Sequence, residues 1–211
     1  MSAALDQLIR DRHVWRGRTT RLPSDRQPTG WSRLDTALPT GGWPEAALSE
    51  ILPAAHGVGE LALVLPTLAR LSARGERVVL VAPPWLPYAP AWQAAGVDLH
   101  QLCVVRAPAG ERAWALEQCL RSGSCGAVLG WLEHADNRTL RRLQVAADSG
   151  RALGFVFRNL AALGNPSPAP LRLEIAPGVV HVRKCRGGQP PAPVAFAGQF
   201  PDKCPAQCLA P

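Results

Sequence analysis

The sequence lacks the features of a membrane or secreted protein. Among its 211 residues no apolar run approaches the ~20 residues that a membrane helix needs. Charges interrupt the apolar positions of the first residues, which argues against a secretory signal. We therefore expect a cytoplasmic chain without a membrane segment.

The 6 cysteines contain no CxxC pair. One set of possible zinc ligands, His181, Cys185, Cys204 and Cys208, fits no standard zinc-ribbon spacing. The sequence accordingly favours plain cysteines, with no metal and no other cofactor. Aromatic residues are unevenly represented, since there is 1 Tyr but 7 Trp.

The net charge of +7 lies at the two ends of the chain. Residues 1–33 carry a net +4 and residues 183–211 a net +3, whereas residues 34–182 are neutral. A hydrophobic content of 47% predicts a globular core between these ends. The basic ends suggest that a polyanion or an acidic partner lies nearby.

Short apolar strands alternate with helical patterns along most of the chain. We expect strands over 47–52, 77–82, 101–105, 126–132 and 153–157, with helices up to 74 and over 90–95, 111–121 and 137–148. Two further strands, 171–175 and 179–183, read as a hairpin. This order predicts an α/β fold in which helices flank a mostly parallel sheet and the hairpin forms an antiparallel edge.

Three regions follow from the same pattern. Residues 1–28 form an N-terminal helix and a basic linker, residues 29–186 the core, and residues 187–211 a Pro-rich tail expected to be extended.

One predicted loop has the spacing of a phosphate-binding P-loop, G-x-x-x-x-G-K-[ST]. With Gly59 on the second glycine, Ala54 falls on the first, Glu60 on the lysine and Leu61 on the hydroxyl, and Gly57 lies between them. The lysine would neutralise phosphate and the hydroxyl would hold Mg²⁺. A carboxylate at a helix N-terminus instead takes the place of the anion and repels a real one. The loop is therefore predicted to be degenerate and without catalytic residues.

The element order from 29 to 175 resembles a RecA-like core. The segments that carry this resemblance are Thr29–Gly30–Trp31, Gly41–Gly42 and Gly96–Val97–Asp98–Leu99. The resemblance implies that the water-activating carboxylate falls on Pro84 and the magnesium-binding aspartate on Gly130. It therefore implies a RecA-like fold without ATPase chemistry. Trp85 and Trp131 flank the vacant site, and they either fill part of it or serve ordinary packing.

A dozen further motifs occur in one order between Trp15 and Gly188. They include Trp15–Arg16–Gly17, Gly41–Gly42–Trp43–Pro44, Gly57–Val58–Gly59–Glu60, Ala82–Pro83–Pro84, Arg141–Arg142–Leu143–Gln144 and Arg183–Lys184–Cys185–Arg186–Gly187–Gly188. Together they resemble the ImuA family of RecA-like, SulA-related accessory proteins. The resemblance implies a non-catalytic role in SOS-induced translesion DNA synthesis with ImuB and an error-prone C-family polymerase. A RecA filament, DNA and a second copy of the chain are further expected partners.

Two groups of residues are candidates for partner or DNA contact. The basic group is Arg138, Arg141, Arg142, Arg158, Arg183, Lys184 and Arg186. The second group is an apolar stripe on the N-terminal helix, formed by Leu5, Leu8, Ile9 and Trp15. By analogy with RecA this helix docks on another protein, although it could equally fold back on its own core.

Two other functions stay open. One is a SulA-like inhibitor that binds the division protein FtsZ. The other is a residual ATPase, against which Glu60 and Gly130 argue.

Overall fold

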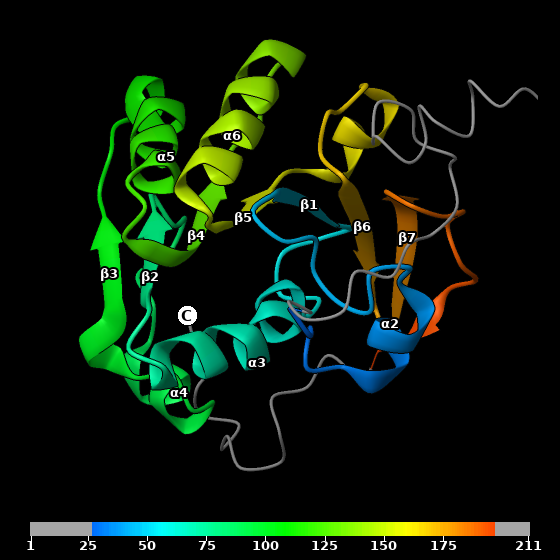
Figure 1. The fold of residues 1–211 in the computed structure, drawn as a ribbon, viewed down its shortest axis with the longest axis horizontal. Coiled ribbons are helices and arrows are strands. Elements are labelled where there is room, and N and C mark those ends of the chain that lie inside the picture. Colours follow the sequence, from blue (N-terminus) through cyan, green and yellow to red (C-terminus); the bar gives the residue numbers. More distant parts are fainter. Residues whose placement is uncertain (1–26, 197–211) are drawn as a thin grey trace, which may run out of the picture.

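A single eight-stranded sheet organises residues 27–196, the part of the chain that the computed structural model describes (Figure 1). The predicted docking stripe of Leu5, Leu8, Ile9 and Trp15 lies outside the described residues, as do Cys204 and Cys208. The strands are β1 (Leu48–Pro53), β2 (Arg77–Val81), β3 (Leu102–Val105), β4 (Cys125–Trp131), β5 (Leu153–Phe157), β6 (Leu171–Ala176), β7 (Val179–Cys185) and β8 (Val194–Ala195). The α-helices are α2 (Ser32–Ala37), α3 (Glu60–Ala73), α4 (Ala89–Ala94), α5 (Arg112–Arg121) and α6 (Asn137–Gly150), with 3-10 turns at Leu99–Gln101, Ala109–Glu111 and Leu160–Gly164.

The strand order is β3-β2-β4-β5-β1-β6-β7-β8. All neighbours from β3 to β6 pair in parallel, and β6, β7 and β8 pair antiparallel. The predicted α/β class, with a mostly parallel sheet and an antiparallel edge, is therefore confirmed. Within residues 27–196, no helix is long and apolar enough to cross a bilayer.

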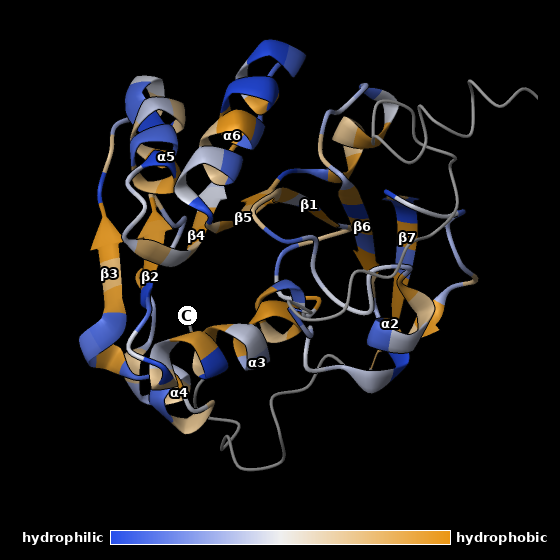
Figure 2. Cartoon of the chain, in the orientation of Figure 1, coloured by the Kyte–Doolittle hydropathy of each residue, from blue (hydrophilic) through white to orange (hydrophobic). Residues whose placement is uncertain are grey.

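Helices cover both faces of the sheet, which is why the central strands are apolar throughout (Figures 1 and 2). Alternate residues of one strand go to opposite faces. In β4, Leu129 packs in the cluster that contains α2, α3 and α4, whereas Val128 packs in the cluster that contains α5 and α6.

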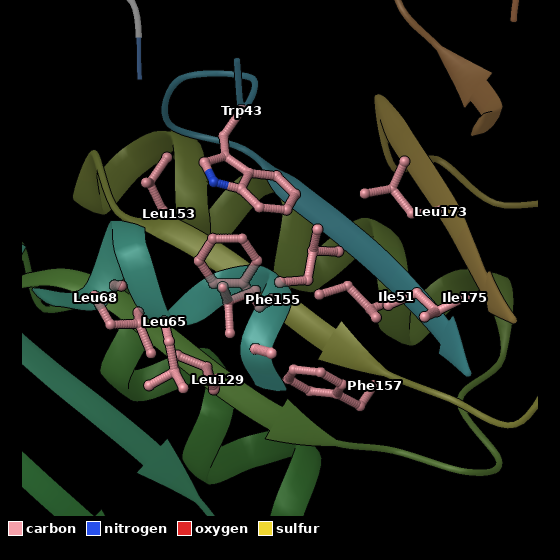
Figure 3. Packing of buried hydrophobic residues seen from close by; sticks show 14 of the residues in the cluster. Trp43, Ile51, Leu65, Leu68, Leu129, Leu153, Phe155, Phe157, Leu173 and Ile175 are labelled. Atoms are coloured by element: carbon pink, nitrogen blue, oxygen red, sulfur yellow. The ribbon is translucent and has the colours of Figure 1, made fainter. Parts of the chain in front are cut away.

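The segment before β1 is fastened to α3 by two indoles. Trp43 is buried and donates its Nε1–H to Thr67 Oγ1 at 2.8 Å, while its ring meets Phe155 edge-on at 4.9 Å (Figure 3). Trp31 donates its Nε1–H to Leu63 O at 3.1 Å. Gly42 has to be glycine, because a Cβ there would lie 2.2 Å from Gln27 O. Packing contacts therefore explain why glycine and tryptophan occur where they do in this segment.

The sheet extends past the predicted end of the core. Residues 187–211 were expected to form an extended tail from residue 187 on, yet Val194 and Ala195 pair with β7 as β8. Phe196 is buried and meets Trp31 edge-on at 4.6 Å. One apolar anchor and a strand edge with free hydrogen-bonding groups are enough to hold this Pro-rich stretch.

Candidate functional site

The loop that links β1 to α3 carries a carboxylate where a nucleotide-binding loop would hold phosphate. As predicted, it follows a strand and α3 begins at Glu60. Gly57 and Gly59 have φ values of 82° and 99°, which favour glycine. Glu60 is buried, and its Oε1 accepts the Gly57 N–H at 3.0 Å. A backbone N–H of the loop is thus satisfied from within the chain.

The other residues at the P-loop positions also fit a closed loop better than an anion-binding site. The second oxygen of Glu60 is buried without a hydrogen-bond partner. Leu61, at the expected hydroxyl position, packs against the hydrophobic core, as Val58 does. Ala54 is exposed, and its N–H donates to Ile175 O at 2.8 Å, which ties the loop to β6. Among the described residues, no group of three or more His, Cys, Asp or Glu could hold a metal ion.

The expected role of Gly130 needs a correction. A Cβ at this position would lie 2.6 Å from Leu116 Cδ2, so residue 130 faces α5 and not the loop. Because side chains alternate along a strand, the residue of β4 that faces the loop is Trp131. Trp131 stacks on Phe157 with ring centroids 4.9 Å apart and packs against the cluster that includes Val58.

Trp85 behaves differently from Trp131. Its ring meets His56 edge-on at 4.8 Å, so the two loops after β1 and β2 touch, but 63% of Trp85 remains exposed. Leu86 and Tyr88 are also exposed, by 72% and 54%. Pro84, the expected carboxylate position, is an exposed member of the same loop. We call residues 83–88 the aromatic loop; it presents apolar surface instead of filling a cleft.

A buried ionic cluster around Glu50 was not anticipated from the sequence. Glu50 of β1 is fully buried, and its carboxylate accepts from Arg172 Nε at 2.8 Å and from Ser167 Oγ at 2.5 Å. Arg158 Nη1 lies 3.5 Å from the same carboxylate. The sequence signal was a glutamate inside the apolar run of β1, because a buried carboxylate needs a charged or hydrogen-bonding partner.

The cluster fastens the segment between β5 and β6 to the sheet. Arg172 donates to the carbonyls of Ala162, Leu163 and Asn165, and Arg158 donates to Ala135 O at 2.7 Å. Burial lowers the pKa of Arg158, and the Glu50 carboxylate opposes that shift. Because the guanidiniums outnumber the carboxylate, the cluster depends on Glu50.

The basic residues expected to contact DNA or a partner fall into separate groups. Arg158 is buried in the ionic cluster, so its role as a surface contact is wrong. Lys184 is half-buried and donates to Ser167 O at 2.7 Å, and burial followed by repulsion from Arg172 lowers its pKa. Arg183 is paired with Glu174 at 2.6 Å, and Arg186 is exposed beyond β7.

The other three arginines share one helix. Arg138, Arg141 and Arg142 are exposed on α6. Arg141 Nε donates to Asn137 Oδ1 at 2.9 Å, and Arg142 pairs with Glu117 of α5. The structure therefore keeps these three together and separates them from Arg183 and Arg186.

Comparisons with known proteins point to one group. The chain is 37% identical over 112 residues to a protein named cell division inhibitor SulA from Edwardsiella piscicida, a match that covers 50% of this chain and 67% of that relative. It is 48% identical over 44 residues to the cell division inhibitor SulA of Photorhabdus laumondii, covering 21% of this chain and 25% of that relative. No known family model matches the chain.

Solved structures of this kind are similar as well. The crystal structure of SulA from Pseudomonas aeruginosa shares 27% sequence identity with the chain at a TM-score of 0.46. The similarity covers 55% of this chain and 99% of that one.

Proposed function

The chain belongs to the SulA family, and on this basis we propose that it acts by binding a protein partner and not by catalysis. The first partner to test is the cell division protein FtsZ, the target of a SulA-like inhibitor. The observation that carries the proposal is Glu60, whose carboxylate occupies the start of α3 and accepts the Gly57 N–H. A nucleotide phosphate would meet a negative charge at the one place where a P-loop offers positive charge.

The aromatic loop supplies the surface for such binding. Trp and Tyr are enriched among the residues that dominate protein interfaces, and here both are exposed together with Leu86. Pro83, Pro84 and Pro87 restrict the backbone, which lowers the entropy lost when the loop is bound. No charged residue occurs between positions 78 and 97, so the loop suits an apolar partner surface.

The test follows FtsZ polymerisation by light scattering with GTP and the purified chain. We expect the wild-type chain to inhibit polymerisation and Trp85→Ala to inhibit it at least tenfold less effectively. The matched control is Trp114→Ala, which removes a similarly exposed indole from α5 and should behave like wild type. If the wild-type chain leaves polymerisation unchanged, division inhibition is not its function.

The proposal that the chain does not bind nucleotide has a separate test. Titration calorimetry with ATP and Mg²⁺ should give no binding heat for the wild-type chain. Measurable binding would contradict the closed loop, independently of the result with FtsZ.

A second candidate is the accessory role in translesion synthesis. This role is supported by the length of the resemblance. The SulA match spans 112 residues, whereas the motifs of the ImuA resemblance run from Trp15 to Gly188. A pull-down with ImuB, a C-family polymerase and RecA, with and without single-stranded DNA, tests it. Retention of ImuB together with unchanged FtsZ polymerisation would favour this role over division inhibition.

A further inference from the structure

Helices α5 and α6 lie side by side and point in the same direction (Figure 1). Each joins two parallel strands of the sheet, so both run opposite to the strands. Their C-terminal ends touch closely, because a Cβ at Gly150 would lie 1.9 Å from Leu120 O. Their outward residues therefore form one continuous surface, the α5–α6 face. The exposed residues of this face are Trp114, Gln118 and Arg121 of α5 and Arg138, Arg141, Arg142, Val145 and Asp148 of α6.

The net charge on this face is positive, because four arginines outnumber Asp148 and the buried Glu117. Glu117 is buried between the helices, and its carboxylate pairs with Arg121 at 2.6 Å and with Arg142. One carboxylate thus positions two guanidiniums that remain accessible, and Arg138 and Arg141 add further positive charge. Figure 2 shows the turns of α6 at the top of the view as hydrophilic.

Helix stability alone does not explain the position of Arg138. Arg138 lies in the first turn of α6, which begins at Asn137, and a cation there opposes the helix macrodipole. Arg141 lies in the second turn, where this effect has faded. The position of Arg138 is consistent with a surface that meets negative charge.

The same face exposes apolar groups. Trp114 is 58% exposed and Val145 60% exposed. An exposed indole and exposed arginines on one pair of helices are the residue types that carry most binding energy in protein interfaces. Association there would bury Trp114 and Val145 and pair the guanidiniums of the face with carboxylates.

We propose that the α5–α6 face is a second docking surface, for an amphipathic helix of another protein that carries acidic residues beside apolar ones. The terminal regions of this chain do not suit the face, because residues 1–33 and 183–211 are themselves basic. A second copy of the face would be repelled by like charge. Single-stranded nucleic acid binds through successive stacking platforms, and this face offers one indole. The inference goes beyond the proposed function, because the face is separate from the aromatic loop.

The probe is a fluorescein-labelled helical peptide with leucines on one side and glutamates on the other, measured by fluorescence anisotropy. We expect Trp114→Ala to weaken binding by about 10- to 30-fold. Arg138→Glu with Arg141→Glu should abolish binding, and added salt should weaken the wild-type interaction. Two controls should bind like wild type: Trp85→Ala, which removes the other exposed indole, and Arg186→Glu, which reverses an exposed charge outside the face.

Three outcomes would overturn the proposal. The first is no binding of the glutamate peptide. The second is equal binding of a peptide in which lysines replace the glutamates. The third is tighter binding of a labelled single-stranded oligonucleotide that the same Trp114 and Arg variants abolish, since the face would then serve nucleic acid. Loss of FtsZ inhibition in Trp85→Ala with intact peptide binding would separate the two surfaces.

Discussion

Replacing Glu50 with glutamine should be among the most destabilising conservative changes in this protein. The carboxylate is fully buried and lies within 3.5 Å of both Arg158 and Arg172. Glutamine keeps the volume, so no cavity forms, but it leaves two buried guanidiniums without a counter-charge. Breaking a buried pair by removing one partner costs about 3–5 kcal/mol. For a chain of this size that corresponds to a fall in Tm of roughly 6–20 °C.

Urea unfolding followed by tryptophan fluorescence measures this loss as a shift of the midpoint at constant m-value. The control is Glu174→Gln on the neighbouring strand β6, whose carboxylate pairs at 2.6 Å with the half-exposed Arg183. That pair should be worth less than about 1 kcal/mol, because water competes for the Arg183 guanidinium. If Glu50→Gln costs no more than Glu174→Gln, the buried cluster does not hold the segment between β5 and β6.

A compensated variant separates charge from packing. Glu50→Leu combined with Arg158→Met and Arg172→Met removes every charge of the cluster together. It should recover most of the stability lost in Glu50→Gln, because apolar side chains of similar volume replace buried ion pairs at little or no cost. Continued instability of this triple variant would place the cost in the lost carbonyl contacts of Arg172 instead.

Two further predictions concern α6. Gly150→Ala should lower the free energy of unfolding by about 1–3 kcal/mol, because its Cβ would press on the backbone at Leu120. Thermal unfolding measures this loss, with Gly164→Ala as the control because a Cβ at that position would meet nothing within 4 Å. Asp136 caps α6 by accepting the Thr139 N–H at 2.8 Å; hydrogen bonding with the Thr139 side chain, and then with its backbone N–H, lowers the pKa of the Asp136 carboxyl. The folded pKa lies below the unfolded one, so the stability from the charged cap is complete above the usual Asp range and is lost as the pH falls through the lowered pKa. Asp136→Asn keeps an acceptor but should remove that pH dependence, as unfolding between pH 2 and pH 6 would show; identical pH profiles would contradict it.

Most of the fold could be predicted because its signals are local. A buried parallel strand has to be apolar on both faces, so a continuous apolar run such as Val78–Val81 can be recognised as a strand from the sequence. The hairpin around Pro177–Gly178 was equally clear, since the turn residues lie between two short apolar runs. The strand β8 escaped prediction, because a stretch with so many prolines is held by pairing and by the burial of Phe196, which are long-range contacts.

The candidate site was only partly predictable, for a related reason. The position of Glu60 at the start of a helix follows from the spacing of Gly57 and Gly59, which is local. The side of the sheet on which residue 130 lies depends on the register of β4. A shift of that register by one residue would place it on the opposite side. The role of Arg158 depends on Glu50, which is 108 positions away in the sequence and adjacent in the sheet.

In open α/β sheets, ligands usually bind in the crevice at the carboxyl ends of the strands. Here the chain fills that region with its own groups. Glu60 occupies the loop after β1, Trp131 stacks on Phe157 at the ends of β4 and β5, and Glu50 with its arginines holds the segment after β5. Each of these contacts removes a donor, a charge or a space that a small ligand would use. The exposed indoles lie further out, on a proline-rich loop and on α5 beside the arginines of α6, and these are the surfaces on which we propose that protein partners bind.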